Sequence, residues 1–300
     1  EVAPQNLLGR RLSKYIRDAN AVANPELLRV ALKLATGTGK TTVMAMIIAW
    51  QTINAVRHPQ SGKFTKGFLV VTPGITIKDR LRVLKPNDPD SYFKTRELVP
   101  QEFLPDIEKA RVVITNYHAF KPREKVAISR GGRALLKGRT GNDIQSQESD
   151  GEMVKRVMPD LMGVKNIMVL NDEAHHCYQD RQPEEDDAPL QGDEKDEAEQ
   201  KNEAARLWLN GLAAVNRKIT VRTVMDLSAT PFFLKGSGGP EGTLFPWTMS
   251  DFSLMDAIEC GIVKLPRVPI SDNISGNDMP MYRNLWDHIG SQMPRKGRRK

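Results

Sequence analysis

Hydrophobic residues along this chain fall into short runs that alternate with longer amphipathic stretches. Five of the runs are rich in Val, Ile, Leu and Met, and each ends where small or polar residues begin. Continuous apolar runs of this length are typical of strands buried on both faces of a parallel sheet. The pattern therefore predicts an α/β fold with a doubly wound, mostly parallel sheet. The expected strands are Val30–Ala35, Gly67–Thr72, Arg111–Thr115, Ile167–Asn171 and Thr223–Ser228.

Composition divides the chain into three parts. Residues 1–26 are expected to form an N-terminal helical segment, and residues 27–235 to form the α/β domain. Residues 236–300 begin with a Gly- and Pro-rich turn region, continue with a short helix near Ser253–Glu259, and then resemble a linker. Inside the α/β domain a long apolar helix is expected from Thr41 to about Ala55.

Two stretches of the α/β domain have the composition of insertions. Residues 121–160 are rich in Arg, Lys, Gly and Ser, and their stretch KGRTGNDIQSQESDGE, residues 137–152, is expected to form a mobile loop. Residues 180–205 are strongly acidic and are expected to begin disordered before they grade into a helix near Glu203. The acidic stretch is either a solvated insertion, which is the simpler interpretation, or a segment that imitates DNA or shields the domain.

The charge of the chain is uneven. The net charge is +7, yet Asp180–Glu203 holds eleven acidic and three basic residues, so the rest carries about +15. A positive balance of this size is typical of a partner for phosphate backbones. The basic tail Arg295–Lys300 could add to it, although a solvated linker explains that tail as well.

Composition also excludes several classes of protein. No apolar run approaches the roughly 18–20 residues that span a bilayer. Cys177 and Cys260 are the only cysteines. Two cysteines exclude a disulfide framework and a four-cysteine zinc site, and they favour a reducing, cytoplasmic location.

The strongest local motif is ATGTGKT, at Ala35–Thr41, between an expected strand and an expected helix. Glycines in such a loop let backbone N–H groups approach phosphate oxygens, and the helix dipole adds positive potential. Lys40 is expected on the β- and γ-phosphates of ATP, and the Thr41 hydroxyl on Mg²⁺. The strict P-loop pattern has glycine where this chain has Leu34, and a chance Gly-Lys-Thr is the alternative. The expected nucleotide-binding residues are Thr36, Gly37, Thr38, Gly39, Lys40, Thr41 and Thr42.

A second motif, NDEAHHC, begins at the last residue of the expected strand Ile167–Asn171. Asp172 is expected to hold Mg²⁺ and Glu173 to orient and deprotonate the attacking water, as in Walker B strands. With Lys40 they form the expected catalytic set. The alternative is a zinc site made by the adjacent residues 175–177, but no fourth ligand stands at zinc-like spacing.

The third motif, SAT at Ser228–Thr230, is weak alone and gains meaning from its place after the other two. The order ATGTGKT, DEAH, SAT resembles the first RecA-like domain of superfamily 2 helicases and translocases. The strings VTPGITIKDRL, ITNYHAF and LSATPFFLKGSG are similar to the Res subunit of type III restriction enzymes, over about Leu27–Pro269.

This resemblance implies roles for residues that the motifs alone leave open. His175, Ser228 and Thr230 would couple ATP hydrolysis to movement. Contacts with the sugar–phosphate backbone of double-stranded DNA are implied for two turns, although capping of a strand end explains the same residues. Those residues are Thr72, Pro73, Gly74, Asn116 and Tyr117.

The resemblance also implies parts that this sequence does not show. They are a second RecA-like domain with arginine fingers, a nuclease domain, and a modification methyltransferase subunit as partner. Without arginine fingers the chain alone is expected to be nearly inactive as an ATPase. A formal nuclease pattern, Pro159-Asp160 with Asp193-Glu194-Lys195, falls in the acidic stretch and is interpreted as coincidence.

Two other functions stay open from the sequence. An RNA or DNA helicase without a nuclease would carry the same motifs, because both track the backbone. The second open function is a non-catalytic module that binds nucleic acid. Its function would remain intact after Lys40→Ala or Glu173→Gln. Trp208 and Leu212, at helical spacing, are expected in the core rather than in a base-stacking platform.

Overall fold

The computed structural model describes residues 4–123, 147–178, 193–233 and 239–264. The chain divides into two compact units, residues 1–263 and 264–300. The second unit lies outside the described residues except for Lys264. The described helices and strands therefore belong to the first unit.

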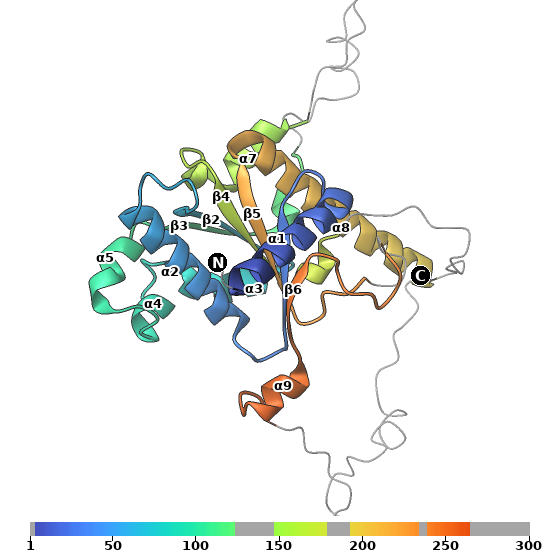
Figure 1. The fold of residues 1–300 in the computed structure, drawn as a ribbon. Coiled ribbons are helices and arrows are strands. Elements are labelled where there is room, and N and C mark those ends of the chain that lie inside the picture. The colour runs from blue at the N-terminus through green and yellow to red at the C-terminus, as the bar shows by residue number, and fades with distance from the viewer. Residues whose placement is uncertain (1–3, 124–146, 179–192, 234–238, 265–300) are drawn as a thin grey trace, which may run out of the picture. The chain divides into compact units, whose positions relative to one another are not determined.

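A six-stranded sheet organises the first unit, with the strand order β3-β2-β4-β5-β1-β6 (Figure 1). Every pairing between neighbouring strands is parallel. The predicted doubly wound parallel sheet is therefore confirmed. The strands are β1 (Arg29–Leu34), β2 (Gly67–Thr72), β3 (Arg111–Asn116), β4 (Ile167–Asp172), β5 (Val221–Ser228) and β6 (Thr248–Phe252).

The interior strands β2 and β4 explain why apolar runs predicted the sheet so well. All residues of both strands are buried, as expected for strands that are covered on both faces. Alternate residues enter different hydrophobic clusters: Leu69 and Val71 enter one, and Phe68 and Val70 the other. Each cluster is closed by its own layer of helices.

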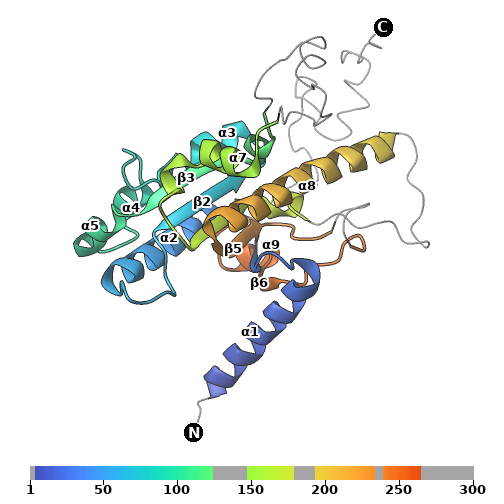
Figure 2. The ribbon, with the colours of Figure 1, turned by 90° about the horizontal axis from the view of Figure 1, so that it is seen from above.

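Helices cover both faces of the sheet (Figures 1 and 2). One layer contains α2 (Lys40–Arg57), α4 (Tyr92–Thr95) and α5 (Leu104–Ile107), and the opposite layer contains α7 (Asp150–Val157) and α8 (Asp193–Ile219). Trp208 and Leu212 of α8 are fully buried, so their expected place in the core is confirmed. The other helices are α1 (Pro4–Ala23), α3 (Ile75–Arg80) and α9 (Leu254–Glu259), and the 3₁₀ turns are η1 (Leu81–Leu84), η2 (Gln101–Phe103), η3 (Tyr117–Phe120), η4 (Pro159–Leu161) and η5 (Ala174–His176).

Helix α7 begins inside the stretch for which the sequence predicted a mobile loop, and that prediction is wrong for residues 150–152. The backbone N–H and the hydroxyl of Ser149 both donate to the Glu152 carboxylate, at 3.0 and 2.7 Å. Such a capping box satisfies groups that a helix start leaves free. The polar composition around it hid this S-x-x-E signal. Residues 137–146 of the predicted loop lie outside the described residues.

Helix α8 also begins earlier than expected, at Asp193 rather than near Glu203. Residues 179–192 of the acidic stretch lie outside the described residues. The predicted helix near Ser253–Glu259 is confirmed as α9.

Strand β6 is the strand that the sequence analysis did not predict. It pairs with β1 at the edge of the sheet, and its residues are partly or fully exposed in alternation. A half-exposed edge strand carries no continuous apolar run. Behind it the Gly- and Pro-rich connection from Phe233 packs three aromatic rings, Phe233, Phe245 and Trp247, into a third buried cluster.

Candidate functional site

Three loops with the predicted motifs meet at the carboxyl edge of the sheet. They follow β1, β4 and β5, which are neighbours in the order β4-β5-β1. Ligands of open parallel sheets bind at this edge because loops from adjacent strands converge there. The order of strands therefore brings together residues that are far apart in the chain.

The loop after β1 has the backbone of a phosphate-binding turn. Gly37 and Gly39 have φ angles of 84° and 91°, a left-handed conformation that glycine adopts freely. A Cβ atom at Gly39 would come no closer than 3.6 Å to its neighbours, so the backbone angle rather than space requires glycine. The Thr38 hydroxyl donates to the Ala35 carbonyl oxygen at 2.7 Å and closes the turn.

Helix α2 begins at Lys40, directly after this turn, and runs for 18 residues. Its first turn contains Lys40, Thr41 and Thr42 and holds no acidic side chain. The unpaired N–H groups and the positive end of the helix dipole make such a start favourable for phosphate. The structure thus places all predicted nucleotide-binding residues, Thr36 to Thr42, in one loop and helix start.

Lys40 reaches across to the loop after β4. Its Nζ lies 3.2 Å from Oε1 of Glu173, and the exposed fractions of the two side chains are 13% and 30%. The sequence predicted this convergence of distant residues around one site. Glu173 adopts a left-handed backbone with φ 50° and ψ 49°, which is strained for a residue with a side chain and is common at functional sites.

Asp172 ends β4 and is almost buried, with 8% exposure. Burial and, to a lesser degree, the charge of Glu173 raise the pKa of Asp172 to about 6, while Lys40 opposes both. A nearby cation would stabilise the charged form of a carboxylate in such an environment. The Thr41 hydroxyl and the Asp172 carboxylate are hard oxygen donors of the kind Mg²⁺ prefers, so the residues present fit a magnesium ion.

His175 joins the loop after β4 to the loop after β5. Its Nδ1 lies 2.9 Å from the Ser228 hydroxyl, which also accepts the Thr230 backbone N–H at 3.0 Å. Burial and the neighbouring His176 lower the pKa of His175 to about 4, so the ring is neutral at pH 7. The three residues predicted to couple hydrolysis to movement are therefore in direct contact, and His175 Nδ1 lies 3.5 Å from Glu173.

The alternative zinc site would need Cys177 beside the two histidines, whose ring centroids lie 4.1 Å apart, but the Cys177 side chain lies elsewhere. Cys177 is fully buried and lies 4.0 Å from Nδ2 of Asn171, whereas His175 contacts Ser228. Burial raises the pKa of Cys177 to about 12, which disfavours the thiolate that zinc binds. Within the described part of the chain no three His, Cys, Asp or Glu residues are arranged to hold a metal.

The residues with predicted nucleic-acid contacts lie at the ends of β2 and β3, which pair with Thr72 opposite Asn116. Thr72 is buried and its hydroxyl donates to the Gly74 carbonyl oxygen at 2.8 Å. Asn116 accepts the Ala119 backbone N–H at 3.1 Å and caps η3. Both side chains stabilise their own turns, and the partly exposed members of this set are Pro73, Gly74, Asn116 and Tyr117.

Arg96 is a residue that the motifs did not reveal. It follows α4, is exposed, and donates from Nη1 to the Thr42 hydroxyl at 3.2 Å. Its guanidinium lies 3.9 Å from the ring centre of Tyr92. A cation thus stands beside the predicted phosphate loop, brought there by a segment between β2 and β3 that carries no recognisable motif.

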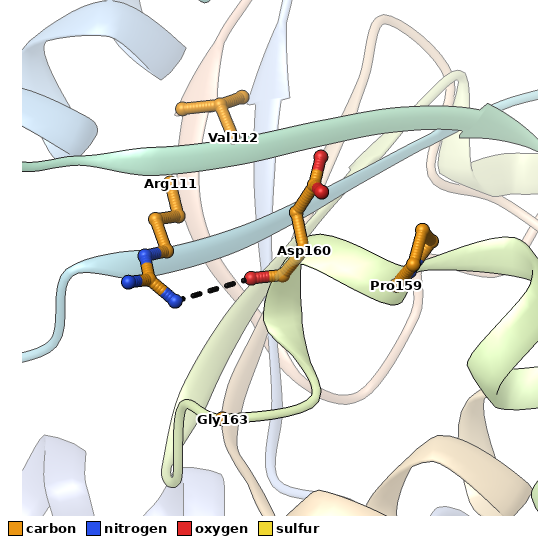
Figure 3. Close-up of a pocket in the computed structure, with 5 residues that line it drawn as sticks. All are labelled: Arg111, Val112, Pro159, Asp160 and Gly163. Carbon is orange, nitrogen blue, oxygen red and sulfur yellow. Dashed lines mark hydrogen bonds between the residues drawn. The ribbon is translucent and has the colours of Figure 1, made fainter.

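A cavity of about 400 Å³ lies at the other edge of the sheet, where β3 begins (Figure 3). The Arg111 guanidinium donates to the main-chain oxygen of Asp160 at 3.4 Å. Asp160 of the formal nuclease pattern therefore lies at this cavity, whereas Asp193 of the same pattern is the first residue of helix α8. The cavity is lined by Arg111, Val112, Pro159, Asp160 and Gly163.

Comparison with protein families adds the decisive observation. The family described as type III restriction enzyme, res subunit, matches residues 9–233, well over half of the chain. The chain belongs to this Res subunit family. Membership implies a superfamily 2, helicase-type, ATP-dependent nucleic-acid motor domain, and the predicted RecA-like fold is confirmed with it.

No curated protein matches the chain. Of the helices in the described residues, none combines the length and the apolar character that crossing a membrane requires.

Proposed function

We propose that this chain is the ATP-binding lobe of a DNA translocase in a restriction endonuclease of type III. The contact between Lys40 and Glu173, which joins the loops after β1 and β4, is the observation that carries the proposal. Lys40 would bind the β- and γ-phosphates, and the same ammonium would then be shared between phosphate and carboxylate. Backbone N–H groups of Gly37, Gly39 and the start of α2 would hold the phosphates.

Thr41 and Asp172 would hold Mg²⁺, which would supply charge neutralisation on the phosphates. Glu173 would accept the proton of the attacking water. His175, neutral at pH 7, would pass the state of this site to Ser228 and Thr230 through its contact with the Ser228 hydroxyl. Pro73, Gly74 and Tyr117 would contact the DNA backbone without reading bases.

The test uses the full-length protein, because the arginine fingers of a second RecA-like domain contribute roughly 10³–10⁵ to the rate. Binding of a fluorescent ATP analogue and Mg²⁺-dependent hydrolysis are measured with duplex DNA and with RNA. Lys40→Ala is expected to abolish nucleotide binding. Glu173→Gln is expected to retain binding and lose about 10²-fold or more in hydrolysis.

Lys109→Ala is the matched control, since Lys109 also pairs with a carboxylate, at 3.4 Å, but on the surface beside α5. Stimulation by RNA and not by DNA would replace the DNA motor with an RNA helicase. Full function of Lys40→Ala and Glu173→Gln would identify a non-catalytic binding module instead.

A further inference from the structure

A cluster of buried polar side chains lies behind the ATP site, between the sheet and the helices. It consists of Arg29 on β1, Asn171 on β4, Asp226 on β5, Trp208 on α8 and Trp247 beside β6. Their exposed fractions are 0%, and 1% for Trp247. Of these residues only Asn171 belongs to a predicted motif, as the first residue of NDEAHHC.

Asp226 is the centre of the cluster. Its carboxylate accepts hydrogen bonds from Arg29 Nε at 2.8 Å, from Asn171 Nδ2 at 2.8 Å and from Trp247 Nε1 at 2.9 Å. Burial alone would lower the pKa of Arg29, but the Asp226 charge leaves it raised above the ordinary value. Arg29 therefore keeps its charge, and its ion pair with Asp226 is held in place by several hydrogen bonds.

Stability alone is a weak explanation for such a cluster. Buried ion pairs are often replaceable by apolar residues without loss of stability, because desolvation opposes the attraction between the charges. What a satisfied buried network does provide is a fixed arrangement of the elements that it joins. The role of this cluster therefore depends on which elements Asp226 and its partners join.

One end of the cluster lies at the loop that holds Glu173. Arg29 Nη2 donates to the Cys177 carbonyl oxygen at 2.6 Å, where that loop ends. Asn171 directly precedes Asp172. Asp226 lies two residues before Ser228, so both side chains point to the same side of β5.

The other end lies at the turn η3, where nucleic-acid contacts are proposed. The Tyr117 and Trp208 rings stack with 5.3 Å between centroids and an angle of 5°. Trp208 Nε1 donates to Asn171 Oδ1 at 3.2 Å. A continuous chain of contacts thus runs from Tyr117 through Trp208 and Asn171 to Asp226.

We infer that Trp208 and Asn171 are positioning residues that couple nucleic acid at Tyr117 to the water-activating loop at Asp172–His175. The inference rests on the proposed function. Tyr117 is half-buried, so a ligand on its accessible part shifts the ring that covers Trp208. Trp208 is completely buried, and its N–H has to keep a partner. A shift of the indole therefore moves Asn171, and with it the residue next to Asp172.

Two tryptophans allow a matched test in the full-length protein. Trp208→Phe keeps a ring against Tyr117 and removes the N–H bond to Asn171. Trp247→Phe removes an equally buried N–H bond to Asp226, on the branch that leads away from η3. We expect Trp208→Phe to lower the stimulation of ATPase activity by duplex DNA about five-fold or more, with unchanged DNA-free kcat and unchanged KM for ATP. Trp247→Phe is expected to leave the stimulation ratio unchanged.

The outcomes separate the inference from the function on which it rests. A wild-type protein whose ATPase responds to neither DNA nor RNA would refute the proposed function, and the inference with it. Stimulation that is intact in Trp208→Phe, or reduced equally in both variants, would overturn the inference alone.

A measurement on the wild-type protein covers the case in which Trp208→Phe does not fold. Coupling between two sites is reciprocal. A non-hydrolysable ATP analogue is therefore expected to change hydrogen exchange in the turn Tyr117–Phe120. Unchanged exchange in that turn, with the analogue bound, would contradict the inference.

Discussion

At the scale of single residues, Asp172 lies in an environment that opposes its own charge. It is nearly buried, and its neighbour Glu173 carries the same sign, while Lys40 compensates only in part. The folded state therefore binds a proton at Asp172 more readily than the unfolded state does. This group stabilises the fold below pH about 4, and the contribution is lost as the pH rises through about 6.

Asp172→Asn is therefore expected to stabilise the chain at pH 7. The pKa shift of Asp172 from 3.8 to about 6 corresponds to a gain on the order of 2–3 kcal/mol in the free energy of unfolding when the charge is removed. Urea unfolding without Mg²⁺ or nucleotide measures it. The gain is expected to disappear at pH 4, and the exposed Asp160→Asn is expected to show none. Equal stability of Asp172→Asn and wild type at pH 7 would show that the Asp172 charge is not opposed by its surroundings.

Arg96 gives a second prediction at this scale. Because it donates to the Thr42 hydroxyl beside the phosphate loop, its charge is expected to favour a bound triphosphate. Arg96→Ala is expected to weaken binding of a fluorescent ATP analogue about five- to ten-fold, the range of a partly solvated charge contact. Arg82→Ala is the control, since Arg82 lies in the same segment and pairs with Asp88 at 3.1 Å. The same affinity in both variants would exclude Arg96 from the site.

At the scale of elements, the close approach of α8 to the turn η3 depends on one glycine. A Cβ atom at Gly211 would lie 2.2 Å from Phe120 Cγ. Phe120 is almost fully buried at 1% exposure and cannot move aside freely. The helix and the turn thus lock together at the place where Trp208, three residues earlier in α8, covers Tyr117.

Gly211→Ala is expected to destabilise the chain by about 1–3 kcal/mol, because overpacking outweighs the better helix propensity of alanine. Gly151→Ala in α7 is the matched control. A Cβ atom at Gly151 would lie 3.7 Å from Lys218 Nζ, an ordinary contact, so the stability of the Gly151→Ala protein is expected to be unchanged or slightly higher. Urea unfolding compares the two, and a Gly211→Ala protein as stable as wild type would show that Phe120 repacks.

The elements also show what a sequence reveals and what it conceals. Strands β2 and β4 were predictable because both of their faces are covered, which forces continuous apolar runs. β6 was not predictable, since an edge strand that alternates exposure can be built from polar residues. The capping box at Ser149 was readable, but the surrounding polar composition outweighed it.

At the scale of the whole molecule, the convergence of the three motifs was predictable because each motif ends a strand, and parallel strands bring their ends to one edge. Lys40 and Glu173 meet for that reason. The buried cluster was not predictable in the same way. Arg29 and Asp226 are 197 positions apart, and nothing in their surroundings marks them as partners. Only the alignment of β1 beside β5 places them in contact.

The position of β6 determines how short a recombinant form of this domain can be. The family match stops at residue 233, but β1, the strand that carries the phosphate loop, is flanked on its outer side by Thr248–Phe252. A recombinant piece that ended at the match would strip β1 of that neighbour and leave its amides open to pairing with other molecules, a known route to aggregation. The shortest recombinant form that does not aggregate should therefore extend past Phe252.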